Sequence, residues 1–418
     1  MFCLCIFINT KLRNGNCMLK KILLFSGVVF LTLSSLSDLS ARVIEIRKKT
    51  ELNPTVYFSG LAGNSAFTKE MNTFLGVCGW FDVTNRSDGA DYTVNVENSG
   101  GRIVVRLLQS KTPIAAWSFP AAANARELAK TVVDTIIERV FEQLKVRGFC
   151  RSKIAFTAQT APGIRNVFVC DIDGGNIQQI TNYRSLNVEP GWSPDGRTLY
   201  FSKYNASGIA IIETTLATPR RSRIISSSRG INTGASVSPD GSKLAVILSP
   251  DHQVDLYCLG LKQRFKKRLT KGIAVEASPC WSPDGQRIAF VSDRRFNPRI
   301  FTCDLSGNNL QMLPSIGSDA VTPAWSKDGK IAYATRIAGN YTIAVYNPAT
   351  GENRRVIELP GNWESPEWAA DNRQVVCKRT IGSESSLYVI DTKTGKQRLL
   401  LKTASRLFDP AWSPCAKK

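Results

Sequence analysis

The sequence of 418 residues is strongly basic, with 54 Lys and Arg against 34 Asp and Glu and a net charge of +20. This balance favours an anionic lipid surface, an acidic polymer or an acidic protein as partner. Nucleic acid is not expected, because the basic residues are spread along the chain without a run longer than three, such as 266–268. The single histidine, His252, excludes a metal site built from several histidines, and a Ser-His-Asp triad would have to use this one residue.

The N-terminal stretch has the features of an export signal. Two lysines are followed by an apolar run at 22–33 and then by a small residue, Ala41. An apolar run of this length is too short to span a membrane, so we predict a secretory signal peptide over 1–41 with cleavage after Ala41. The first 17 residues fit poorly in front of it, and the sequence leaves open whether translation starts at Met1 or Met18.

Residues 42–150 are predicted to form a separate α+β domain. Alternation of apolar and polar residues predicts strands, and apolar positions at helical spacing predict two helices. Asn124 with Glu127 three residues later resembles a capping box at the start of the second helix. The expected strands are 42–47, 56–58, 92–96, 103–107 and 115–119, and the expected helices are 65–78 and 124–146.

The rest of the chain, 151–418, is dominated by a repeat of the type Trp-Ser-Pro-Asp-Gly. A period of about 40–45 residues, with a short apolar strand after each copy, is typical of a β-propeller with one four-stranded blade per repeat. In each copy the Trp is expected to pack between blades, while Pro, Asp and Gly form a hairpin turn. The six copies begin at Trp192, Val237, Trp281, Trp325, Trp368 and Trp412, which are 45, 44, 44, 43 and 44 residues apart.

The two ends of the repeat region predict how the ring closes. The segment 154–156 matches the strand that follows each turn, but the unit that it begins has no Trp-bearing strand of its own. The last copy supplies a Trp-bearing strand at Trp412. The four residues that follow its Ser413 and Pro414 do not continue the repeat. We therefore predict a mainly β fold with a six-bladed propeller. The C-terminal strand completes the blade begun at residue 153 and removes an exposed sheet edge.

Eight of the 11 cysteines lie beyond Ala41. Cys170, Cys258 and Cys303 occupy the same phase in three different blades, so we expect small, buried side chains beyond bridging distance of one another. Cys78 and Cys150, both before the propeller, are the two cysteines that could pair, and the sequence leaves their disulfide state open.

The surface that a propeller offers to a ligand is its central channel, rimmed by the loops that lead into the innermost strands. In five of the six copies this loop reads x-Pro-x-Trp. Its first residue is expected to contribute to a ring of mostly small polar groups, open enough to admit a loop or strand of another protein. The alternative is that these residues only turn the chain. The ring consists of Glu189, Ser278, Thr322, Ser365 and Asp409, with Gly234 in the copy that departs from the pattern.

No residue pattern indicates catalysis, and we predict no catalytic, cofactor-binding or metal-binding residues. The Asp of each repeat is explained by its place in a turn, and no glycine-rich phosphate loop leads from a strand into a helix. The alternative is a periplasmic propeller enzyme of the lactonase or sialidase type, with its active site in the channel. A metal ion in that active site would need acidic or amide side chains that converge on it. The rim supplies only Glu189 and Asp409 as carboxylates.

The order of these parts resembles the TolB family of the Tol–Pal system. The resemblance covers 42–418 and rests on the export signal, the α+β domain and blades that end in a Trp-Ser-Pro just before the C-terminus. It implies a monomeric, soluble periplasmic scaffold without catalytic activity or cofactor, which supports outer-membrane integrity and envelope constriction during cell division. The implied partners are the outer-membrane lipoprotein Pal, the C-terminal domain of the inner-membrane protein TolA, and other outer-membrane proteins.

The resemblance also implies which residues contact the two partners. Pal would bind the channel face, and TolA would bind the N-terminal segment 42–53, where alternating apolar and charged residues suit strand addition. The Pal-facing residues are Ile231, Asn232, Thr233, Gly234, Glu276, Ala277 and Ser278, with Glu189, Thr322, Ser365 and Asp409 as their equivalents in other blades. The TolA-facing residues are Arg42, Val43, Ile44, Glu45, Ile46 and Arg47.

Overall fold

The computed structural model describes residues 53–121, 124–219 and 221–415, and before them the backbone of three strands. These are β1 (Cys5–Lys11), β2 (Cys17–Phe25) and β3 (Val28–Leu31), which pair antiparallel in a unit, Met1–Pro54, distinct from the unit Thr55–Lys418. The predicted cleavage site and the predicted partner-binding residues 42–52 lie outside the described residues, so both stay predictions. No helix in the described part of the chain has the length and apolar character needed to cross a membrane.

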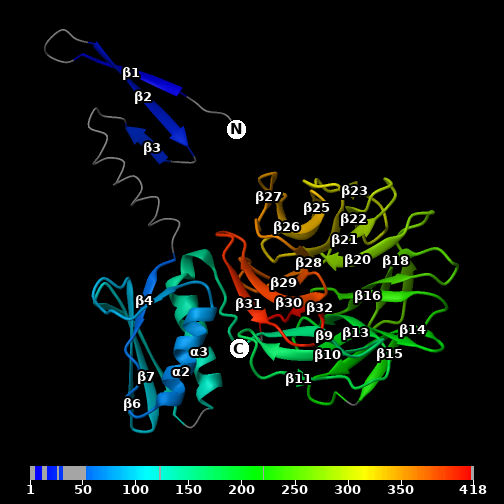
Figure 1. Ribbon diagram of the computed structural model, residues 1–418, viewed down its shortest axis with the longest axis horizontal. Helices are drawn as coiled ribbons and strands as arrows, with labels where there is room; N and C mark the ends of the chain where they lie inside the picture. The colour runs from blue at the N-terminus through cyan, green and yellow to red at the C-terminus, as the bar shows by residue number, and fades with distance from the viewer. Residues whose placement is uncertain are drawn as a thin grey trace. The chain divides into compact units, whose positions relative to one another are not determined.

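The N-terminal domain is built on one five-stranded sheet with strand order β5-β4-β6-β7-β8. β4 pairs parallel with β5 and β6, and the remaining neighbours pair antiparallel. Figure 1 shows the two helices side by side along this sheet. The predicted α+β fold is confirmed, although β5 was not predicted. The elements are β4 (Thr55–Phe58), α2 (Ser65–Val77), β5 (Asp82–Thr84), β6 (Tyr92–Ser99), β7 (Arg102–Gln109), β8 (Thr112–Pro120) and α3 (Ala125–Val140).

The second helix, α3, is shorter than predicted. Asn124 caps its start, because its side chain accepts hydrogen bonds from two backbone N–H groups of the first turn. The helix ends at Val140 rather than at 146, since Phe141 leaves the helical conformation and packs against Trp80 and Phe81, with ring centroids 4.6 and 5.5 Å apart. A 3-10 turn, η1 (Glu142–Leu144), follows.

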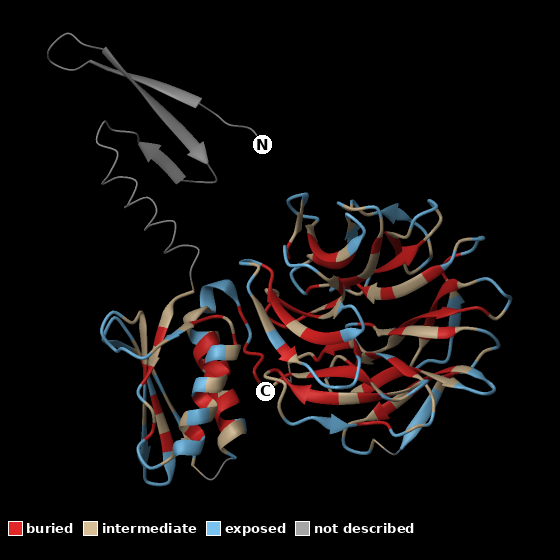
Figure 2. Cartoon of the chain, in the orientation of Figure 1, coloured by how far each residue is buried: buried red, intermediate tan, exposed pale blue. Residues whose placement is uncertain are grey.

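Six four-stranded antiparallel sheets follow in the described part of the chain, as the repeat predicts. Figure 2 shows that the two middle strands of the sheets are largely buried, whereas the innermost strands are partly buried and the outermost strands are mostly exposed or intermediate. Five sheets take their strands consecutively from the sequence. Their bounds are β12 (Asn187–Trp192), β13 (Thr198–Asn205), β14 (Gly208–Thr215), β15 (Ser222–Ser226); β16 (Asn232–Val237), β17 (Lys243–Leu248), β18 (Asp255–Gly260), β19 (Lys266–Arg268); β20 (Glu276–Trp281), β21 (Arg287–Ser292), β22 (Arg299–Asp304), β23 (Gln311–Met312); β24 (Ala320–Trp325), β25 (Ile331–Ile337), β26 (Asn340–Asn347), β27 (Glu352–Arg355); β28 (Asn362–Trp368), β29 (Gln374–Ile381), β30 (Glu384–Asp391) and β31 (Gln397–Leu401).

The sixth sheet closes the ring in the predicted way. Its order is β11-β10-β9-β32, so a strand from the C-terminal end lies beside one from the start of the propeller (Figure 1). Trp412 lies opposite Ile154, and Leu407 lies opposite Ala158. The strands are β9 (Lys153–Ala161), β10 (Ile164–Asp171), β11 (Gln178–Gln179) and β32 (Leu407–Trp412).

The Trp of the repeat joins neighbouring blades, as predicted. Trp192, Trp281 and Trp368 each donate an indole N–H to a backbone carbonyl of the innermost strand in the preceding blade, at 2.9–3.0 Å. Trp325 differs, because its indole donates to the carbonyl of Gly329 in its own turn, at 3.1 Å. The ring of blades is therefore held by directional hydrogen bonds as well as by apolar packing.

The Ser-Pro-Asp-Gly segments form the predicted turns. In the copy that begins at Trp281, Ser282 Oγ donates a hydrogen bond of 2.6 Å to Asp284 Oδ1, and Gly285 has a φ of 69°. The serine hydroxyl holds the pKa of the Asp284 carboxyl below its ordinary value. The same Ser–Asp hydrogen bond recurs at Asp195, Asp240 and Asp328. These carboxylates are satisfied within their own turns.

The cysteines follow the packing expectation. Cys170, Cys258 and Cys303 are buried in three different blades, as predicted. Cys78 and Cys150 are buried free thiols and do not form a disulfide. Burial raises the pKa of Cys78 to about 12, so its reactive thiolate form is scarce at neutral pH.

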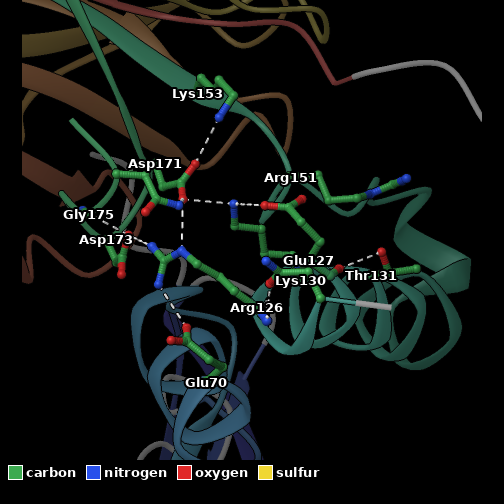
Figure 3. A network of polar contacts seen from close by, with 12 residues as sticks. Glu70, Arg126, Glu127, Lys130, Thr131, Arg151, Lys153, Asp171, Asp173 and Gly175 are labelled. Atoms are coloured by element: carbon green, nitrogen blue, oxygen red, sulfur yellow. Dashed lines mark hydrogen bonds and ion pairs between the residues drawn. The ribbon is translucent and has the colours of Figure 1, made fainter. Parts of the chain in front are cut away.

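Polar contacts join the N-terminal domain to the propeller. The Trp80 indole donates to Asp371 Oδ2 in the turn of the fifth repeat, at 2.9 Å. Figure 3 shows a second set of contacts, in which Arg126 and Lys130 of α3 both reach the buried carboxylate of Asp171 at the end of β10, at 2.9 and 2.8 Å. The first contact attaches the segment between α2 and β5 to the blade of β28–β31, and the second attaches α3 to the blade that closes the ring.

Candidate partner-binding channel

The innermost strand of every blade carries a β-bulge at the same point. In β12, for example, pairing skips from Val188 to Gly191, and the other five innermost strands skip two residues at the equivalent place. The first skipped residue has a left-handed backbone in each case. These residues are Glu189 (φ 55°), Gly234 (68°), Ser278 (47°), Thr322 (48°), Ser365 (53°) and Asp409 (47°). They are the six residues that the sequence predicts for the channel rim.

The proline of the x-Pro-x-Trp pattern explains the bulge. Proline has no N–H to give to the neighbouring strand, so it occupies the second skipped position in five blades. The preceding residue is excluded from the right-handed helical region and here takes the left-handed one, which costs a residue other than glycine about 1 kcal/mol. In the second blade, Gly234 takes this conformation without that cost, and the next residue is Ala235 rather than proline.

The six rim residues line a single cavity of about 300 Å³ where the innermost strands converge. The channel therefore brings together positions spread over 221 residues of sequence, from Glu189 to Asp409. The predicted rim is thus one continuous surface, formed by all six blades. A strained backbone conformation persists only where the surrounding fold holds it in place. Such conformations cluster at functional sites, including sites that bind ligands.

A second set of residues, the inner ring, was not predicted from the sequence. It consists of the residue before the last position of each innermost strand: Gly191, Ser236, Cys280, Ala324, Glu367 and Ala411. All but Ala324 line the same cavity. Five of the six are small, and Glu367 is the single large and charged member. That contrast among the repeats was visible in the sequence and would have been enough to identify Glu367.

The channel is acidic although the chain as a whole is strongly basic. Glu189, Glu367 and Asp409 are its charged lining residues, and none of the described residues that line it is Lys, Arg or His. Glu189 is held by hydrogen bonds, since its Oε2 accepts from the backbone N–H of Gly234 at 3.0 Å and from Ser202 Oγ at 3.3 Å. Burial, followed by the nearby charge of Asp409, raises the pKa of the Glu189 carboxyl.

Several other residues predicted to contact Pal do not line this cavity. Asn232 is fully buried, and its side chain bonds within its own loop, to Ser226 and Ser228. Glu276 is also buried and forms an ion pair with Arg294 at 2.5 Å. The cavity lining likewise omits Ile231, Thr233 and Ala277, which are partly exposed, and the predicted TolA-facing residues Arg42 to Arg47 lie outside the described residues.

The described residues bear on the alternative of a propeller enzyme with a metal ion in its channel. They contain no group of three or more His, Cys, Asp or Glu side chains placed to hold a metal ion. His252 lies on an exposed turn with a φ of 65°, and it does not line the channel. The described channel lining combines carboxylates with small polar and apolar residues.

A closed ring of six blades that follows a small α+β domain in the sequence, with an acidic channel between the innermost strands, defines a two-domain propeller protein. The family model described as "TolB beta propeller domain" matches residues 141–416, and the chain belongs to this family. It is 31% identical over 223 residues to the "Protein TolB homolog" of Chlorobium chlorochromatii, covering 51% of this chain and 48% of that one. The chain thus spans about half the length of that relative.

Two further comparisons extend over more of the chain. The "Tol-Pal system protein TolB" of Helicobacter pylori is 24% identical over 307 residues, covering 71% of this chain and 73% of that protein. The crystal structure of TolB from Acinetobacter baumannii superposes with a TM-score of 0.77 at 22% identity, covering 87% of this chain and 97% of that one. This likeness confirms the fold that the repeat predicts.

Proposed function

We propose that this protein is a non-enzymatic periplasmic scaffold of the Tol–Pal system, whose channel binds a Pal-type outer-membrane lipoprotein. The observation that carries the proposal is the channel, where six bulges, five of them strained, converge on one cavity of about 300 Å³. The Helicobacter pylori relative carries the name of the Tol–Pal system, which makes a protein of that system the first partner to test.

The rim suits a protein loop better than a small substrate. Its side chains are short and mostly polar, and five of its residues are followed by prolines that keep the backbone rigid. A preorganised surface loses little conformational entropy on binding, which favours affinity for a partner of matching shape. The predicted contact set on this surface is Glu189, Gly234, Ser278, Thr322, Ser365 and Asp409.

The second partner in the proposal is a TolA-type inner-membrane protein, which binds the segment 42–53. Ile44 and Ile46 alternate with Glu45 and Arg47 in this segment, the pattern of a strand with one apolar face. Such a peptide can add to the edge of a sheet in its partner through backbone hydrogen bonds. The protein would then connect the two membranes, supporting outer-membrane integrity and envelope constriction during division.

A pull-down from envelope extract tests both halves of this proposal. The baits are the purified chain 42–418 and a copy that lacks 42–53, which leaves the compact unit from Thr55 onward intact. Both should recover a Pal-type lipoprotein, and only the longer one should recover a TolA-type protein. Recovery of neither by the longer bait would contradict the proposal, and loss of both by the shorter bait would contradict the division of labour between the two sites. Equal thermal unfolding of the two baits is the control for folding.

A further inference from the structure

Glu367 differs from the other acidic residues on the innermost strands. Glu276 pairs with Arg294, and Glu364, three residues before Glu367, pairs with Lys378 at 2.8 Å. The Glu367 carboxylate, by contrast, has no hydrogen bond or ion pair with any residue that the structure describes. Glu367 is partly buried, and an unpaired charge in such surroundings is costly, so a natural fold seldom keeps one without a use for it.

The space around Glu367 is open on the channel side. The other inner-ring residues that line the cavity with it are Gly191, Ser236, Cys280 and Ala411, and all have small side chains. Cys280 lies two blades away, yet after burial the charge of Glu367 is the largest influence raising the pKa of its thiol. The two side chains therefore face a common space, in which Glu367 is the single charged group of the inner ring.

Glu367 is also in an environment that favours a cationic neighbour. It retains some exposure because it faces the channel, but the surrounding protein is dense enough that burial raises the pKa of its carboxyl to about 7. The remaining charged lining residues, Glu189 and Asp409, are acidic as well. A positive group that entered the channel would meet three carboxylates and no competing cation among the described lining residues.

We propose that Glu367 determines which partner the channel accepts, by pairing with one Lys or Arg side chain on the loop that enters it. This inference rests on the proposed function, in which that loop belongs to a Pal-type lipoprotein. A basic side chain suits the site better than a bare metal ion, because the described residues place no set of three ligating side chains there.

The test is calorimetric titration of the chain 42–418 with the soluble domain of the Pal-type lipoprotein from the same organism. Glu367→Gln keeps the shape of the side chain and removes its charge, and we expect it to weaken binding at least about tenfold at pH 7.5. Glu352→Gln, on the exposed outer strand β27, makes the same charge change and should leave affinity unaltered. Substitution of each Lys and Arg in the partner loop by Gln should identify one whose loss weakens binding to the unaltered chain but not to the Glu367→Gln variant.

The proton balance gives a second readout. Pairing with a cation lowers the pKa of Glu367, so binding near pH 7 should release protons, and the variant should release fewer. Equal affinity of the unaltered chain and the Glu367→Gln variant would overturn the inference while leaving the proposed function standing. A weakened variant without coupling to any basic residue of the partner would also overturn it, in favour of a small cation in the channel. No binding by the unaltered chain would overturn the proposed function and this inference with it.

Discussion

The guanidinium of Arg126 in α3 donates a hydrogen bond of 2.9 Å to the carboxylate of Asp171, which lies 45 residues later at the end of β10. The two terminal nitrogens of the same guanidinium contact the carboxylates of Glu70 at 2.8 Å and Asp173 at 2.6 Å (Figure 3). One side chain thus links α2, α3 and the blade that closes the propeller. Arg is suited to this place because its planar fork can serve several carboxylates at once.

Replacement of Arg126 should destabilise the protein strongly. Arg126→Met keeps much of the apolar stem but leaves Asp171, which is fully buried, with Lys130 and Lys153 as its remaining cations. We expect a loss of about 2–4 kcal/mol in the free energy of unfolding, measured by urea denaturation. The control is Arg106→Met, which breaks an exposed pair with Glu97 and should cost less than about 1 kcal/mol. Equal losses in the two variants would refute a structural role for the Arg126 network.

Replacement of Trp412 should weaken the closure of the ring. Trp412 is buried, donates its indole N–H to Ser152 Oγ at 2.7 Å and packs on Phe149 with ring centroids 6.0 Å apart. We expect Trp412→Ala to cost about 3–5 kcal/mol in thermal or chemical unfolding. Trp325→Ala, at a Trp that bonds within its own turn, should cost less. An unfolding midpoint unchanged by Trp412→Ala would contradict closure by the C-terminal strand.

Substitution by glycine at a rim residue should not destabilise the fold, unlike the same substitution elsewhere in a strand. Thr322 is β-branched and has a φ of 48°, a conformation that only glycine adopts without strain. Thr322→Gly should therefore be neutral or should stabilise the fold by up to about 1 kcal/mol in thermal unfolding. Its neighbour Val321, paired with Ala334 in the same sheet, is the matched control, since Val321→Gly should destabilise. Similar destabilisation by both changes would count against strain at the rim.

Glu367 predicts a specific pH dependence of stability. Because its pKa is raised in the folded state, from 4.5 to about 7, folding favours the protonated carboxyl. The contribution of Glu367 to the free energy of unfolding is therefore most favourable below pH 4.5. It becomes less favourable as the pH rises to about 7, by about 3 kcal/mol at most. Glu367→Gln does not titrate, so its stability relative to the unaltered chain should increase over this range. Parallel pH profiles of the free energy of unfolding for the two proteins would exclude a partly buried, unpaired Glu367.

The repeat allowed most of the fold to be predicted, because its rules are local. Trp, Pro and Gly recur with a fixed spacing, and each favours the same local geometry in every blade, so blade number and closure follow from counting. The end of α3 could not be predicted in this way. Helical spacing continues beyond Val140, but packing of Phe141 against Trp80, 61 residues earlier in the sequence, ends the helix.

The site was predicted less completely than the fold. Glu189 and Asp409 occupy the same position in their repeats, which was sufficient to group them. The burial of Asn232 and Glu276 depends on contacts within and between loops, which the spacing of the repeats does not reveal. Glu367 was missed because the position before the Trp was treated as variable. A comparison of that one position across the six copies would have shown five small residues and one carboxylate.

Hydrogen exchange measured by mass spectrometry tests the central claim most directly, because it leaves the chain unaltered. The free chain 42–418 is compared with the same chain saturated with the soluble domain of the Pal-type lipoprotein. We predict slower exchange in the innermost strands β12, β16, β20, β24, β28 and β32, around the six bulges, and no change in the outer strands β15, β19 and β23. Protection confined to the outer strands, or no protection in a complex shown to form, would contradict the channel as the binding site.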